Sequence, residues 1–203
     1  MNLHEALAQI AEIRQQVART ETFRGYRSTP VAFSGMLAIL AAGLQAWWID
    51  DPLASMAQYL TLWISAAAFS LVVTGVAMVL YCRRSDSPLS VPSAKLAVEQ
   101  FTPSLLAGVA LTWAIVARAS EAIWMLPGLW SVVFALGIFA SYRLLPKPTF
   151  LVGVYYLLAG VCCLAIAQGP HALSPWAMAI PFGLGQLFAA AVLYWTLERP
   201  HGD

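Results

Sequence analysis

The stretch "FRGYRSTPVAFSGMLAILAAGLQAWWID", residues 23–50, changes character abruptly at Pro30. Arginine and aromatic residues crowd its first positions, whereas no charged residue follows Pro30 until Asp50. The uncharged run 30–49 matches the length of about 20 mostly apolar residues that a helix needs to cross a bilayer. The stretch therefore predicts a transmembrane helix with a basic and aromatic segment at its membrane boundary.

The composition of the whole chain extends this interpretation. Of its 203 residues, 60% are hydrophobic and only 10% are charged, and the mean hydropathy is +0.71. Soluble domains carry about 25% charged residues. A net charge of +1 does not fit the strongly basic face that binds nucleic acid. Eight tryptophans fit the aromatic belts of a membrane protein.

Five further uncharged runs follow along the chain: 52–82, 100–117, 122–142, 148–168 and 175–197. The predicted fold is therefore all-α, a polytopic membrane protein with six transmembrane helices. Helix starts are expected at Pro30, Pro52 and Pro175, because each proline follows a residue that favours the N-cap. The short third run is expected to begin as a polar turn near Pro92 and to enter the membrane at a kink around Pro103.

Lys and Arg fall almost entirely on one side of the predicted membrane. That side holds Arg14, Arg19, Arg24, Arg27, Arg83, Arg84, Lys95, Arg143, Lys147 and Arg199, and the other side holds Arg118. Cytoplasmic loops are enriched in these residues, so both termini are predicted to be cytoplasmic, in a bacterial-type inner (plasma) membrane. The first 29 residues are polar and do not resemble a cleaved signal peptide.

Three segments are predicted. Residues 1–29 form a cytoplasmic amphipathic helix followed by the basic and aromatic segment, 30–199 form the six-helix bundle, and 200–203 are a cytoplasmic tail. The helix is indicated by an apolar residue at every third or fourth position, namely Leu3, Leu7, Ile10, Ile13 and Val17. Its apolar face could adhere to lipid, pack on the bundle, or contact another subunit of a homo-oligomer.

The basic and aromatic segment has two interpretations. Arg24, Tyr26 and Arg27 could simply anchor and orient the first helix. Alternatively, their guanidinium groups, completed by Arg83 and Arg84 on the same side, could hold the phosphate of an anionic lipid or of a phosphorylated ligand.

The membrane-spanning runs contain few residues that could take part in catalysis, ion transport or metal binding. No Asp, Glu, Lys, Arg or His lies in the middle of any run, which argues against an ion-coupled transporter, a proton pump and an intramembrane protease. The three cysteines, Cys82, Cys162 and Cys163, lack metal-ligand spacing. We therefore predict no catalytic residue, no metal site and no cofactor.

The sixth run contains the most unusual sequence, "AIPFGLGQLFAAA". Pro181 removes one backbone hydrogen bond and frees the carbonyl of Ala177. Gly183 and Gly185 loosen the helix, and Gln186 places an amide near the middle of the membrane. Such an interruption could form a ligand or solute site from freed backbone groups, or it could be a kinked helix that packs tightly on a neighbour.

Two functions remain open from the sequence. The first is a non-enzymatic scaffold or regulatory subunit that binds a protein partner or lipid through its cytoplasmic faces. The second is a carrier or channel for a small neutral or apolar solute, using the broken sixth helix. A dry, filled bundle would favour the first, and a water-filled cavity lined by Gln186 would favour the second.

Overall fold

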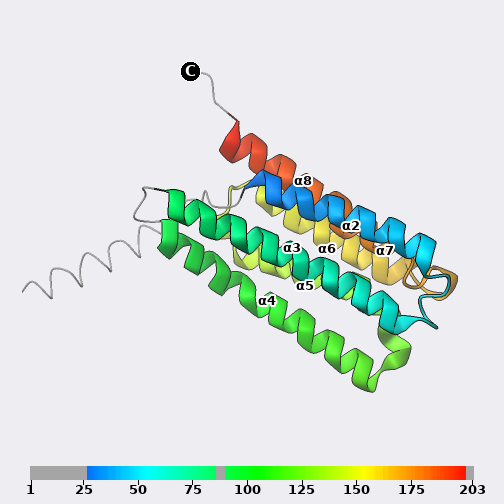
Figure 1. Cartoon of the computed structure of the whole chain (residues 1–203). Coiled ribbons are helices and arrows are strands. Elements are labelled where there is room, and N and C mark those ends of the chain that lie inside the picture. Colours follow the sequence, from blue (N-terminus) through cyan, green and yellow to red (C-terminus); the bar gives the residue numbers. More distant parts are fainter. Residues whose placement is uncertain (1–26, 86–89, 200–203) are drawn as a thin grey trace, which may run out of the picture.

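The computed structural model describes residues 27–85 and 90–199, which are helical apart from short turns and contain no strand (Figure 1). The predicted N-terminal helix, Arg24, Tyr26 and the tail 200–203 lie outside the described residues. Six helices of the described part are long and apolar enough to cross a membrane. The predicted all-α bundle is therefore confirmed.

Five spans are single helices or nearly so, and the sixth is interrupted. They are α2 (Ser28–Trp48), α3 (Met56–Arg84), α4 (Ser90–Arg118), η1 (Ser120–Met125) continued by α5 (Leu126–Ala140), and α6 (Thr149–Ile166). The sixth span consists of α7 (Trp176–Met178), η4 (Ala179–Leu184), α8 (Gly185–Leu193) and η5 (Tyr194–Glu198). Two short turns, η2 (Tyr142–Leu144) and η3 (Gly169–His171), complete the described chain.

The helix starts differ in part from those predicted. α2 begins at Ser28, two residues before Pro30, and the regular part of α3 begins at Met56 instead of Pro52. Residues 52–55 form a turn, and Asp51 Oδ1 accepts hydrogen bonds from the N–H groups of the second and third residues of that turn, at 3.0 and 3.1 Å. Asp51 therefore caps this turn and not the first turn of α3 itself.

The third span begins two residues before Pro92, close to the expected start. α4 is continuous from Ser90 to Arg118 and contains Pro103 within it. Its polar first turns are helical because one face is buried: Ala97 packs with Leu144 and with α3 side chains. Lys95 and Glu99 point outward and form an ion pair at 3.6 Å. Burial of one face thus stabilises these polar first turns as part of the helix.

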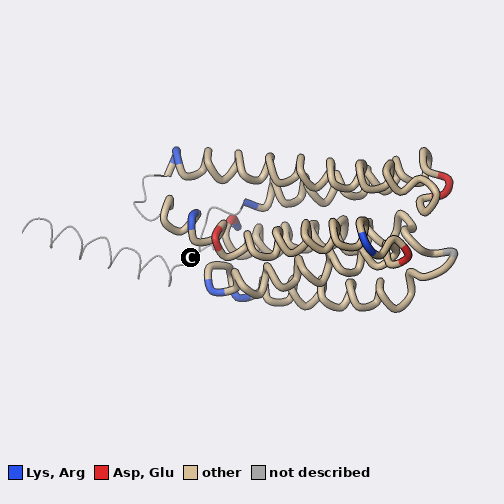
Figure 2. The backbone as a smooth tube through the Cα atoms, turned by 90° about the horizontal axis from the view of Figure 1, so that it is seen from below, with Lys and Arg blue, Asp and Glu red and all other residues tan. Residues whose placement is uncertain are grey.

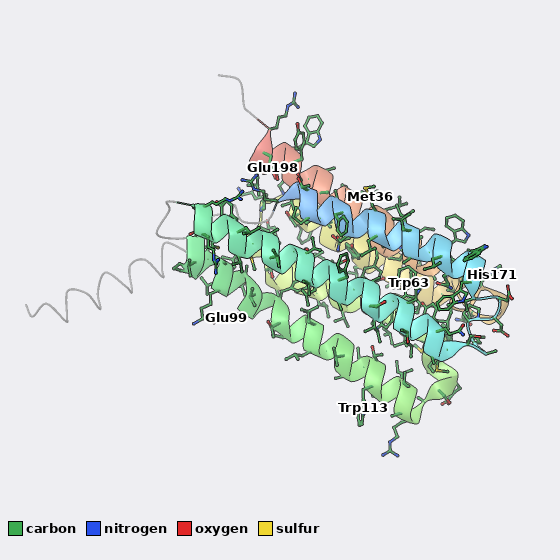
Figure 3. All side chains as sticks on the ribbon, viewed as in Figure 1. Met36, Trp63, Glu99, Trp113, His171 and Glu198 are labelled. Atoms are coloured by element: carbon green, nitrogen blue, oxygen red, sulfur yellow. The ribbon has the colours of Figure 1, made fainter. Side chains whose placement is uncertain are left out.

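Four spans form a tight inner bundle, and the other two lie outside it. Within it, neighbouring spans cross at glycines: a Cβ on Gly35 of α2 would lie 2.9 Å from the carbonyl oxygen of Gly183 in the sixth span, and a Cβ on Gly160 of α6 would lie 2.8 Å from the carbonyl oxygen of Gly128 in α5. α3 and α4 flank this group on one side (Figure 1). In the most apolar 18-residue window of α4, no residue is buried, and Trp113 points away from the bundle (Figure 3).

Charged residues lie at the two ends of the bundle (Figure 2). We call one end the basic end, which carries Arg27, Arg83, Arg84, Arg143, Lys147 and Arg199. We call the other the acidic end, which carries Asp50, Asp51 and Glu121 together with Arg118. The long middle of the bundle between them is uncharged, as an apolar bilayer core requires.

Candidate functional site

The sixth span is interrupted as predicted, and two side chains of α6 donate hydrogen bonds to backbone carbonyls at the interruption. Residues Ala179–Leu184 around Pro181 form a π-helical segment. The hydroxyl of Tyr155 donates to the carbonyl oxygen of Ile180 at 2.6 Å. The thiol of Cys163 donates a weak hydrogen bond to Ala177 at 3.9 Å, the carbonyl that Pro181 was predicted to free. These groups are therefore used within the protein.

The two glycines of this segment are contact points between helices. A Cβ on Gly183 would lie 2.7 Å from Cγ1 of Ile39 on α2. A Cβ on Gly185 would lie 2.7 Å from Cζ of Tyr156 on α6. Small residues at helix interfaces in membranes let the backbones approach closely, so each glycine admits a different neighbouring helix.

Gln186 lies beside the same crossing and is half-buried. Its Cβ would lie 3.1 Å from a Cβ built on Gly35. No hydrogen bond joins its amide to another residue in the described part of the chain. The structure thus brings Pro181, Gly183 and Gly185 into a packed crossing with Gln186 at its edge.

Aromatic rings fill the space next to this crossing. Tyr156 is fully buried, with ring centroids 4.7 Å from Phe134, 5.7 Å from Phe182 and 5.8 Å from Tyr155. Its hydroxyl has no hydrogen-bond partner among the described residues. The middle of the inner bundle is therefore filled by rings in contact.

A buried polar cluster that the sequence analysis missed lies near the acidic end. Gln45 on α2 is fully buried; its Oε1 accepts from Trp63 Nε1 at 2.8 Å, and its Nε2 donates to the carbonyl oxygen of Leu173 at 2.7 Å. Leu173 has a φ of +55°, in the left-handed region that non-glycine residues rarely adopt. The amide thus holds a strained loop residue against α2 and α3. One signal was available: Gln45 is the single amide in run 30–49.

The described surface is hollowed at both ends of the bundle. At the acidic end, a hollow of about 580 Å³ lies between the start of α3, η1 and the loop after α6, with Met56, Glu121 and Trp124 among its lining residues. At the basic end, a hollow of about 470 Å³ is lined by Arg27, Tyr81, Tyr194, Leu197 and Glu198. We call the second one the basic-end hollow.

The basic-end hollow contains one of the predicted phosphate-binding arginines. The guanidinium carbon of Arg27 lies 5.8 Å from the centroid of the Tyr81 ring, within cation–π range. Arg83 and Arg84 follow Tyr81 in the last turn of α3 and are exposed. The structure therefore brings Arg27 to the end of α3 that carries these two arginines.

Glu198 also lines this hollow, and the sequence analysis did not single it out. Its Oε1 accepts from the backbone N–H of Ser28 at 2.7 Å, and its Oε2 accepts from the hydroxyl of Ser28 at 2.8 Å. A carboxylate is favourable at a helix N-terminus, where N–H groups lack partners inside the helix. Glu198 thus joins the end of the sixth span to the start of α2 (Figure 3). It is the single acidic residue after the sixth run and before the tail.

Other candidate sites receive no support from the described residues. Within 27–85 and 90–199, no three His, Cys, Asp or Glu side chains come together as metal ligands. His171 lies in the loop at the acidic end, far from Glu198 (Figure 3).

No protein-family model matches the chain, and searches of curated proteins and of solved structures find no similar protein.

Proposed function

We propose that the protein is a non-enzymatic integral membrane scaffold or regulatory subunit, which binds a partner subunit or a phospholipid through its basic end. The observation that carries this proposal is the basic-end hollow, where Arg27 and Glu198 from opposite ends of the chain meet two tyrosines. Charged and aromatic side chains at a helix end, open to the surface, are suited to recognise a polar group at the membrane boundary.

A carrier or channel has less support from the geometry. Such a protein needs polar groups that face a path through the membrane. Here the carbonyls of Ala177 and Ile180 have partners on α6, and Gly183 and Gly185 are in contact with α2 and α6. The filled middle of the bundle favours a structural or regulatory role.

The proposal predicts that Arg27 is needed to retain the bound species. The full chain, extracted in a mild detergent and examined by native mass spectrometry, should carry a phospholipid or a subunit. Arg27→Gln should lose it, because the amide has no charge. Arg118→Gln is the matched control, since Arg118 is an exposed arginine at the acidic end and should retain it. Equal retention in both variants would contradict the proposal.

We also infer that the basic end faces the cytoplasm and that both termini lie there, supported by the Lys and Arg asymmetry. In a background with Cys82, Cys162 and Cys163 replaced by alanine, a cysteine at Ala54 should react with an impermeant thiol reagent applied to intact cells. A cysteine at Ser87 should react only after the cells are opened. The reverse labelling pattern would overturn the orientation.

A further inference from the structure

The basic-end hollow holds two opposite charges that do not neutralise each other. Within the described residues, Arg27 and Glu198 form no ion pair, although both line the hollow. The carboxylate of Glu198 is held in place by the N–H and hydroxyl of Ser28. The guanidinium of Arg27 is placed over the ring of Tyr81. Each charge is thus fixed by its own neighbours and remains available to a ligand.

This arrangement selects among ligands by charge. A phosphodiester is attracted by the guanidinium of Arg27, which can donate two parallel hydrogen bonds to it. A second negative charge on the same ligand would be repelled by Glu198. An ammonium group, in contrast, is attracted both by this carboxylate and by the face of an aromatic ring such as Tyr194.

We propose that the basic-end hollow binds the headgroup of a zwitterionic aminophospholipid of the phosphatidylethanolamine type, with its phosphate facing Arg27 and its ammonium facing Glu198. This inference rests on the proposed function, because it names the ligand of the same site. The hollow lies at the depth of lipid headgroups, because it is at the charged end of the bundle. The same end carries Arg27, Arg83, Arg84 and Arg199.

A primary amine fits the carboxylate better than a quaternary one. Each oxygen of Glu198 accepts one hydrogen bond from Ser28, and a carboxylate oxygen can accept about two. A primary ammonium has three N–H donors to offer, whereas a choline group has none. Phosphatidylcholine should therefore bind more weakly than phosphatidylethanolamine, and phosphatidylglycerol should bind more weakly still because its headgroup has no ammonium to face Glu198.

The test is lipid competition on the purified full-length protein. The protein is exchanged into micelles with equimolar phosphatidylethanolamine, phosphatidylcholine and phosphatidylglycerol, and the retained lipids are counted by native mass spectrometry. The wild type should retain phosphatidylethanolamine preferentially. In Glu198→Gln, the ratio of phosphatidylethanolamine to phosphatidylglycerol should fall roughly threefold to fivefold, the effect of one partly exposed ion pair. Glu121→Gln, a carboxylate at the acidic end, should leave the ratio unchanged.

A second variant guards against loss of folding, because Glu198 also contacts Ser28. Tyr194 is 48% exposed, so Tyr194→Leu should keep the thermal unfolding midpoint of the wild type. The variant should retain less phosphatidylethanolamine and less phosphatidylcholine relative to phosphatidylglycerol, since the ammonium groups of both lipids lose one aromatic face. An unchanged lipid ratio in this variant and in Glu198→Gln would overturn the inference.

The remaining outcomes separate this inference from the proposed function. If the wild type prefers phosphatidylglycerol and loses it in Arg27→Gln, the headgroup assignment is wrong and the proposed function stands. If phosphatidylcholine binds as well as phosphatidylethanolamine, the preference for a primary amine is wrong, and the proposed function again stands. If Arg27→Gln loses neither a lipid nor a protein subunit that the wild type retains, both proposals are wrong.

Discussion

Replacing Gln45 by leucine is expected to lower the free energy of unfolding by about 2–6 kcal/mol, because one buried donor and one buried acceptor lose their partner at about 1–3 kcal/mol each. Leucine fills a similar volume but cannot accept from Trp63 Nε1 or donate to the carbonyl oxygen of Leu173. Hydrogen bonds between membrane helices average only about 0.6 kcal/mol. We expect a larger loss here because one amide serves two partners at once.

The measurement is the thermal unfolding midpoint of purified Gln45→Leu and wild type in the same detergent. Gln168→Leu is the matched control. Gln168 is exposed and follows the end of α6, and its Nε2 donates to the carbonyl oxygen of Leu164 in the last turn of that helix at 3.1 Å, so its replacement should leave the midpoint unchanged. Equal midpoints for Gln45→Leu and Gln168→Leu would contradict a stabilising role for the buried amide.

Replacing Gly160 by alanine should destabilise the crossing of α5 and α6. The added methyl group would lie 2.8 Å from the carbonyl oxygen of Gly128 and 3.0 Å from the backbone nitrogen of Val132. Backbone atoms cannot rotate away as a side chain can, so the two helices must separate. Overpacking of this kind costs about 1–3 kcal/mol.

Replacing a glycine by alanine where the added methyl group meets no neighbour should preserve or raise the stability of the protein. Gly108 on α4 has no atom within 4 Å of an added Cβ. Alanine is better than glycine in the middle of a helix by about 0.5–1 kcal/mol. The unfolding midpoint should therefore fall in Gly160→Ala and stay or rise in Gly108→Ala. A fall of equal size in both variants would show that the loss reflects helix composition and not the α5–α6 contact.

The number and type of the helices could be predicted from the sequence because a bilayer imposes a length on every span. An uncharged run of about 20 residues has few alternatives to a transmembrane helix. The start of α4 at Ser90 lies two residues from the predicted position near Pro92, but its packing could not be predicted. Residues around Lys95 lie outside the uncharged run, and their helical structure depends on packing of Ala97 against Leu144, which a local pattern does not contain.

The candidate sites were less predictable because they depend on pairing between distant residues. Pro181 correctly indicated an irregular helix. That Gly183 would face α2 and Gly185 would face α6 follows only from the packing. The carboxylate of Glu198 meets Ser28 across 170 positions of sequence, and no spacing rule predicts such a pair.

The contact between the first and last spans has a consequence for biosynthesis. α2 packs against η4 and α8 at Gly35 and Gly183, and Glu198 binds Ser28 at its first turn. A ribosome synthesises α2 well before these partners, because four other spans lie between them in the chain. The surface of α2 around Gly35 therefore lacks its native partner while the intervening spans are synthesised. The inner bundle therefore closes only after the sixth span has been inserted, so the order of synthesis delays the contact that joins its two most distant spans.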